Sequence, residues 1–140
     1  WINTNENFKG IACALDQYVL ASVTAAEALG KKDDLLWVGY DGNKENYDHI
    51  NDGTQLVDQF TGGYRVGYWN IAAAARILNG EDIPKDVFLK CHQIMSDETA
   101  NMLAGKGYVV EYVTPEEAAK LATDCYGDFG PELSTTDFVG

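Results

Sequence analysis

The feature that most constrains the fold is an alternation of short apolar runs with stretches of helical periodicity. Runs at residues 10–15 and 35–40 are too short for helices and have the near-continuous apolar character of strands buried on both faces. Each is followed by a stretch with apolar residues at helical spacing, over residues 17–29 and 45–51. This order predicts an α/β protein with a parallel sheet and right-handed crossovers.

The alternation continues with a third strand over residues 55–61, whose polar composition favours a position near a sheet edge. A long helix is predicted over residues 64–78. Its apolar stripe consists of Val66, Trp69, Ala73 and Ile77. A fourth strand is expected to open at residues 87–89.

The last third of the chain has a different pattern. Ser96 can cap a short helix that extends to Leu103, and residues 108–113 have strand composition. Thr114-Pro115-Glu116-Glu117 is a capping box with proline at the first helical position, which predicts a helix over residues 115–125. Residues 128–140 are typical of an extended or frayed tail.

Charge and composition exclude several classes of function. The net charge of −12 over 140 residues disfavours binding to nucleic acid or to anionic membrane surfaces. No apolar run reaches the length of a membrane span, and no signal peptide is visible at the start of the sequence. Cys13, Cys91 and Cys125 are expected to be buried thiols, with a Cys91–Cys125 disulfide as the alternative.

A candidate site lies where the predicted parallel strands end. Asp16, Asp41 and Thr61 follow three strands in turn, so they are expected along one rim, where open parallel sheets bind ligands. Carboxylate oxygens there can accept hydrogen bonds from the hydroxyls of a polyol. Tyr18, Tyr40 or Tyr64 could cover the apolar face of a sugar ring.

Each of the rim residues also has a purely structural interpretation. Asp16 is the natural cap of the following helix, and a ligand contact is the alternative for it. Asp41 precedes Gly42 in a dipeptide typical of turns, and Thr61 could simply end its strand.

No pattern points to catalysis, a metal or a cofactor. Asp41, Asn43 and Glu45 have the first offsets of a calcium loop, but Asn46 stands where glycine is required. The sequence has neither a G-x-G-x-x-G fingerprint nor a G-x-S-x-G elbow. We therefore expect a binding protein without a cofactor or metal rather than an enzyme.

Taken together, the order of the motifs resembles the type I periplasmic binding proteins for sugars, the ribose-binding group. The resemblance covers roughly residues 8–95 and rests on several short stretches in combination. These are Gly10-Ile11-Ala12-Cys13-Ala14-Leu15-Asp16, Ala25-Ala26-Glu27-Ala28-Leu29-Gly30-Lys31, Trp37-Val38-Gly39-Tyr40-Asp41-Gly42, Ile50-Asn51-Asp52-Gly53, Gln59-Phe60-Thr61 with Gly67, and Ala75-Arg76-Ile77-Leu78-Asn79-Gly80-Glu81.

The resemblance implies a ligand held in a cleft between two flavodoxin-like lobes. It implies that Asp41 binds sugar hydroxyls and that the hinge-strand position, often Gln or Asn in the family, is Thr61 here. The position before Asp16 is commonly Asn in the family and is Leu15 here. Because two of three polar contacts are altered, the resemblance favours a less hydroxylated ligand than a plain hexose or pentose.

The resemblance also implies that the chain is part of a larger assembly. Residues 1–61 would belong to the carboxyl-terminal lobe, residues 62–88 would cross to the amino-terminal lobe, and residues 89–140 would form a return strand and an extension. Two lobes need about 100–150 residues each, so we expect a fragment or a companion chain that carries the missing part. The apolar stripe of the helix at residues 64–78 would then lack its covering sheet.

The function that this resemblance implies is capture of a sugar-like molecule for an ABC importer. The expected partner is the transporter permease, and the expected location is periplasmic or extracellular, with a lipid anchor in the missing amino-terminal region as one possibility. The alternative is the effector-binding domain of a lac-repressor-type transcriptional regulator. An enzyme on an α/β scaffold is the third hypothesis, and the absence of a catalytic motif argues against it.

Overall fold

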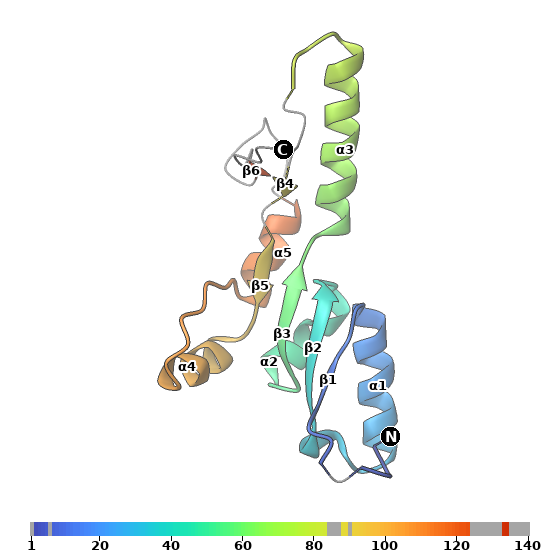
Figure 1. Cartoon of the computed structure of the whole chain (residues 1–140), viewed down its shortest axis with the longest axis vertical. Coiled ribbons are helices and arrows are strands. Elements are labelled where there is room, and N and C mark those ends of the chain that lie inside the picture. Colours follow the sequence, from blue (N-terminus) through green and yellow to red (C-terminus); the bar gives the residue numbers. More distant parts are fainter. Residues whose placement is uncertain (1, 6, 84–87, 90, 124–132, 135–140) are drawn as a thin grey trace.

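The fold is built on a four-stranded sheet with the order β1-β2-β3-β5. The computed structural model describes residues 2–5, 7–83, 88–89, 91–123 and 133–134 (Figure 1). β1, β2 and β3 are parallel, and β5 is antiparallel to β3, which confirms an α/β fold with a mostly parallel sheet. The strands are β1 (Gly10–Ala12), β2 (Leu36–Asp41), β3 (Gln55–Phe60) and β5 (His92–Ile94). A separate ribbon pairs β4 (Phe88–Leu89) with β6 (Leu133–Ser134).

The helices lie at three places around this sheet (Figure 1). α1, α2 and α5 pack against the sheet, α3 extends beyond the end of β3, and α4 lies to one side. The α-helices are α1 (Asp16–Ala28), α2 (Tyr47–Asn51), α3 (Gly63–Leu78), α4 (Asp97–Gly105) and α5 (Pro115–Thr123). Two short 3-10 turns, η1 (Lys32–Asp34) and η2 (Lys44–Asn46), precede β2 and α2.

Two apolar clusters form the core on the helix-covered face. In the first, Val19, Val23 and Ala26 of α1 pack against Trp37, whose indole Nε1 donates to Ser22 Oγ at 2.8 Å. The second joins α2, β3, β5 and α5 through Ile50, Phe60, Ile94 and Ala118.

Along β2 the opposite face of the sheet is exposed. Side chains alternate along β2, and the outward set of Leu36, Val38 and Tyr40 is 48%, 38% and 43% exposed. The predicted burial of β1 and β2 on both faces is therefore wrong for this chain, because α1, α2 and α5 pack on the face that carries Trp37 and Phe60. We call this surface the bare face.

The predicted edge position of the third strand is also wrong. β3 lies between β2 and β5, and its polar residues Gln55 and Asp58 are fully buried. The register shifts beside Trp37 and Val38, which pair with Gln55 and Val57. This β-bulge places Gln55 and Asp58, three residues apart, on the same helix-covered face.

The helix caps of the last third agree with prediction. Ser96 Oγ accepts from Thr99 N at 3.2 Å to cap α4. In the capping box, Thr114 N donates to Glu117 Oε2 at 2.8 Å, and Glu117 N donates to Thr114 Oγ1 at 3.3 Å. The predicted end of this helix at residue 125 lies outside the described residues, as does most of the tail at 128–140.

The predicted strand over residues 108–113 is absent. Only Val113 pairs with the sheet, through an isolated bridge to Ile94, and Val109 is fully exposed. The apolar residues of this segment therefore do not enter a ladder. Cys13 is half-buried and Cys91 is exposed, so the expected burial of Cys91 is wrong, and Cys125 lies outside the described residues.

The apolar stripe of α3 is only partly covered. Trp69 is buried, whereas Val66 is 39% exposed and Ile77 is 59% exposed. Among the described residues, no helix combines the length and the apolar character needed to cross a membrane.

Candidate functional site

The three predicted rim residues lie together at one edge of the sheet. β1, β2 and β3 are parallel, so their carboxyl ends meet there. Thr61 N donates to the backbone oxygen of Asp41 at 3.3 Å, and Asn43 N in the loop after Asp41 donates to Asp16 Oδ2 at 2.6 Å. The structure thus joins Asp16, Asp41 and Thr61 through one loop, as the strand order requires.

Asp41 has the most unusual backbone of the three. Its φ of 121° makes it the only non-glycine residue with positive φ in the described ranges. Such a conformation costs free energy and is concentrated at functional sites. The Asp41 side chain is partly exposed, and no hydrogen bond from a described residue reaches its carboxylate. A carboxylate held in this way is available to a ligand.

The predicted role of Asp16 as a helix cap is wrong. Leu15 occupies the capping position in extended conformation, and Asp16 is the first residue of α1. Its carboxylate is turned instead toward the loop after β2, where it accepts from Asn43 N. The predicted ligand contact of this fully buried side chain stays a prediction.

Beneath the loop lies a buried polar network that sequence reasoning missed. Asp58 Oδ1 accepts from Gly42 N at 3.2 Å, and Asp58 Oδ2 accepts from Gln55 Nε2 at 3.1 Å. Asn46 Nδ2 donates to Gln55 Oε1 at 3.0 Å and to the backbone oxygen of Asp16 at 3.3 Å. The available signal is the pair of polar residues inside the third strand, whose polar composition predicts a position near a sheet edge.

Asp16 and Asp58 influence each other's titration in this network, and both side chains are fully buried. Burial, together with the hydrogen bond and the charge of Asp16, raises the pKa of Asp58 to about 8. Burial also raises the pKa of Asp16, although its hydrogen bonds with Asp58 and Asn43 oppose the rise. The two carboxyl groups therefore share one proton at neutral pH and titrate as a pair.

Glycine at position 39 makes room for this network. A Cβ atom there would lie 2.4 Å from Gln55 Nε2 and 2.5 Å from Asp16 Oδ1. Nearby, burial followed by the charges of Asp58 and Asp16 raises the pKa of Tyr47 to about 12, so its hydroxyl stays neutral and donates to Gly42 O at 3.4 Å.

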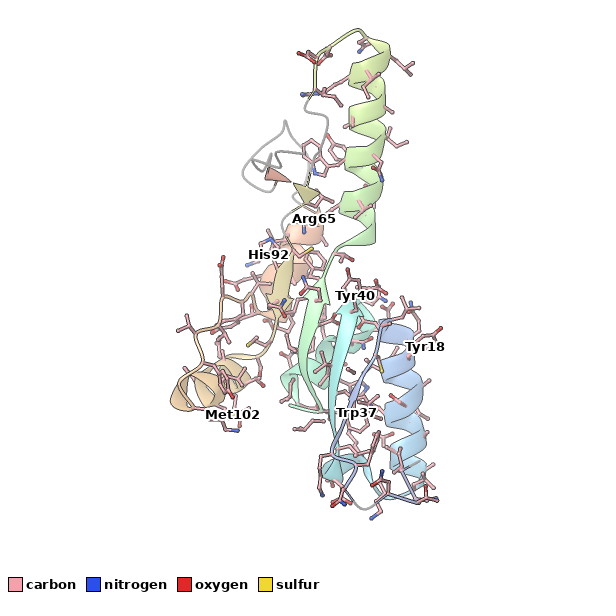
Figure 2. The ribbon with its side chains drawn as sticks, in the orientation of Figure 1. Tyr18, Trp37, Tyr40, Arg65, His92 and Met102 are labelled. Carbon is pink, nitrogen blue, oxygen red and sulfur yellow. The ribbon has the colours of Figure 1, made fainter. Side chains whose placement is uncertain are left out.

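Apolar and aromatic side chains surround the rim. Leu15 is 39% exposed beside Asp16, and Tyr18 is 58% exposed in the first turn of α1. Tyr40 at the end of β2 and Tyr18 lie toward the same end of the sheet (Figure 2), whereas Tyr64 is exposed in the first turn of α3.

The connection from β3 to α3 is packed around an aromatic ring. Gly62, with φ of 67°, links the two elements. The guanidinium of Arg65 lies 5.3 Å from the centre of the Phe60 ring, and the His92 ring lies 6.5 Å from it (Figure 2). This contact fixes where α3 leaves the sheet, directly after Thr61.

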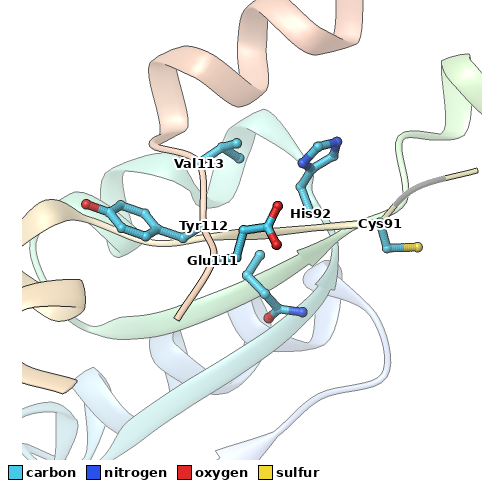
Figure 3. Close-up of a pocket in the computed structure, with 6 residues that line it drawn as sticks. Cys91, His92, Glu111, Tyr112 and Val113 are labelled. Atoms are coloured by element: carbon cyan, nitrogen blue, oxygen red, sulfur yellow. The ribbon is translucent and has the colours of Figure 1, made fainter. Parts of the chain in front are cut away.

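A hollow lies beside β5. It is an open cavity of about 350 Å³ between β5 and the segment at 111–113, lined by Cys91, His92, Gln93, Glu111, Tyr112 and Val113 (Figure 3). The Gln93 amide donates to Gln59 Oε1 and so ties the floor of this cavity to β3.

Comparison with solved structures identifies the fold. An ABC transporter periplasmic solute-binding protein from Actinobacillus succinogenes 130z with bound D-allose matches 71% of this chain at 23% identity and a TM-score of 0.64. An ABC transporter solute-binding protein from Agrobacterium vitis with bound D-fucose matches 79% of it at 22% identity and a TM-score of 0.62. The fold is that of a solute-binding protein.

A Mycobacterium smegmatis protein in complex with β-D-fucofuranose shares this fold, matching 87% of the chain at 16% identity and a TM-score of 0.62. The chain spans only 35–38% of the length of these three solved chains. No protein-family model and no curated protein matches the sequence. The three solved structures confirm the type I periplasmic-binding-protein fold predicted from the sequence.

Proposed function

We propose that this chain is part of a non-enzymatic binding protein that holds a sugar at the carboxyl edge of its sheet for ABC-type import. The observation that carries the proposal is the strained Asp41, whose carboxylate stands at this edge with no partner among the described residues. The three solved structures with this fold contain D-allose, β-D-fucofuranose and D-fucose, which supports a sugar as the ligand class.

In this proposal each rim residue has a separate task. The Asp41 carboxylate accepts two hydrogen bonds from neighbouring sugar hydroxyls, which are charge-assisted and therefore strong. Thr61 contributes a hydroxyl, Leu15 contacts an apolar part of the ligand, and Tyr18 covers a C–H face of the ring. A deoxy sugar such as fucose suits a site in which Leu15 and Thr61 replace more polar residues.

The bare face supports a further part of the proposal. Leu36, Val38 and Tyr40 form an exposed apolar row on the sheet, and Ile77 and Leu78 of α3 are exposed at 59% and 86%. Apolar surfaces of this kind mark an interaction site. We propose that a further segment or a companion chain covers them and supplies the second wall of the cleft. We use the term native protein for this chain together with that covering part.

Intact mass and size-exclusion chromatography of the natively expressed protein test this point. The proposal predicts a species larger than 15.4 kDa that contains these 140 residues. A cooperatively folded monomer of 15.4 kDa would contradict it. Coupling to a permease and a periplasmic or extracellular location follow from the same proposal. The three structures lend no support to the regulator alternative.

The sugar site is tested by substitutions at Asp41 in the native protein, titrated with D-allose and D-fucose in a calorimeter. Asp41→Asn keeps a side chain that tolerates positive φ but removes the charge, and we expect affinity to fall by about a hundredfold from the loss of two charge-assisted hydrogen bonds. Asp41→Gly should abolish binding and yet stabilise the fold by about 1 kcal/mol, because glycine relieves the strain. Asp48→Asn, an exposed acid of α2, is the matched control.

The decisive result is an Asp41→Gly variant that is more stable than the wild type but no longer binds the sugar. Unchanged affinity in both Asp41 variants would remove this residue from the site.

A further inference from the structure

The loop that carries Asp41 is held from below by two acids. Gly42 N, adjacent to Asp41, donates to Asp58 Oδ1, and Asn43 N donates to Asp16 Oδ2. Both acids are fully buried, and Gln55 and Asn46 tie them to β3 and η2. The backbone around the strained Asp41 therefore rests on this pair.

Only one arrangement of protons satisfies the pair. Both oxygens of Asp58 accept from N–H groups, and Asp16 Oδ2 accepts from Asn43 N. Asp16 Oδ1 is buried and accepts no hydrogen bond from a described residue. A single shared proton between the acids completes the network, whereas two buried carboxylates in contact would repel each other.

We propose that Asp58 and Asp16 act as a proton-sharing acid pair that positions Asp41, so that sugar affinity falls when the pair loses its proton. Asp58 is a positioning residue here, since it acts on the ligand only through the loop. This inference rests on the proposed function for the role of Asp41, but the acid pair can be measured without a sugar.

The surroundings of the pair set the direction of the pH effect. The titratable groups that face it are Cys13 after β1, Asp41 at the end of β2 and Tyr47 in α2, with Glu45 of η2 facing Tyr47. None of these is a cation, so none stabilises a doubly ionised pair. The pKa of Asp58 near 8 places the loss of the proton just above neutral pH. The loop is then anchored at neutral pH and released in alkali.

The two acids are not equivalent, which gives matched variants. In Asp16→Asn the new amide can accept from Asn43 N and donate to Asp58, so the network is complete without a titrating proton. In Asp58→Asn the new amide places N–H₂ against Gln55 Nε2, so two donors face each other. The first variant should lose the pH dependence, and the second should weaken sugar binding at every pH.

The test combines calorimetry and NMR on the native protein between pH 6 and pH 9.5. With D-fucose or D-allose as the probe, Kd of the wild type should rise about tenfold from pH 7 to pH 9. The reason is that the fraction of molecules whose acid pair holds its proton falls by that factor. Asp16→Asn should change by less than about twofold, and Asp48→Asn, the charge control, should follow the wild type. Without sugar, the amide resonances of Gly42 and Asn43 should titrate near pH 8 in the wild type and not in Asp16→Asn.

Amide resonances that do not move between pH 6 and pH 9.5, or that move equally in Asp16→Asn, would overturn the acid pair whatever the sugar does. A sugar affinity with the same pH profile in the wild type and in Asp16→Asn would overturn its effect on Asp41. If the amides titrate as expected but neither sugar binds at any pH, the acid pair stands as the anchor of the loop and the proposed function fails.

Discussion

The two faces of the sheet differ although they are formed by the same strands. Along β2, Trp37 is fully buried under α1, whereas its neighbours Leu36 and Val38 are 48% and 38% exposed. All of these residues are apolar, so the strand is suited to burial on both sides. The difference shows that β2 has the sequence of a strand covered on both sides, whereas a helix of the described residues covers only one side of it.

The first prediction concerns Trp37→Ala on the covered face, where the largest effect on stability is expected. The indole is fully buried and its Nε1 donates to Ser22 Oγ, so its loss leaves a cavity and removes this hydrogen bond. We expect a loss of about 3–5 kcal/mol in the free energy of unfolding, measured by urea titration with circular dichroism. A loss below about 1 kcal/mol would show that the covered face is not the core.

The second is Gly39→Ala, which acts on the polar part of the covered face. The new Cβ would lie 2.4 Å from Gln55 Nε2 and displace the network beneath the loop. We expect a destabilisation of about 1–3 kcal/mol in the same urea titration. Gly67→Ala in α3 is the control, because nothing lies within 4 Å of its Cβ position, and it should be neutral or stabilising by up to about 1 kcal/mol. Equal effects at both sites would contradict the packing described around Gly39.

The third and smallest effect is expected from Leu36→Ala on the bare face. In the 140-residue chain the half-exposed side chain should contribute less than about 0.5 kcal/mol. In the native protein the same change should cost about 2 kcal/mol or more if a further segment covers this face. The difference between the two urea titrations measures the covering directly, and identical values would argue that the face stays bare.

Local signals in the sequence predicted much of the fold. The capping box before α5 and Ser96 before α4 describe interactions within one turn of chain, and both form as expected. The predicted strand over residues 108–113 was wrong because strand composition does not reveal whether a partner strand is within reach. The edge position of β3 failed for a different reason, since its polar residues are buried in a network whose other members come from α1 and η2.

The same limit applies to the candidate site. The strand order was sufficient to bring Asp16, Asp41 and Thr61 to one edge. The turn of the Asp16 carboxylate away from its own helix, and its pairing with Asp58, depend on a bulge that no local pattern predicts. The positive φ of Asp41 could likewise not be predicted from the sequence, because Asp-Gly is compatible with several turns.

A crystal structure of the native protein grown with D-fucose or D-allose tests the central claim most directly. The account predicts a sugar at the carboxyl edge of β1, β2 and β3, with two of its hydroxyls within hydrogen-bonding distance of the Asp41 carboxylate. A sugar bound instead in the cavity beside β5, or an Asp41 side chain turned away from the bound sugar, would contradict it.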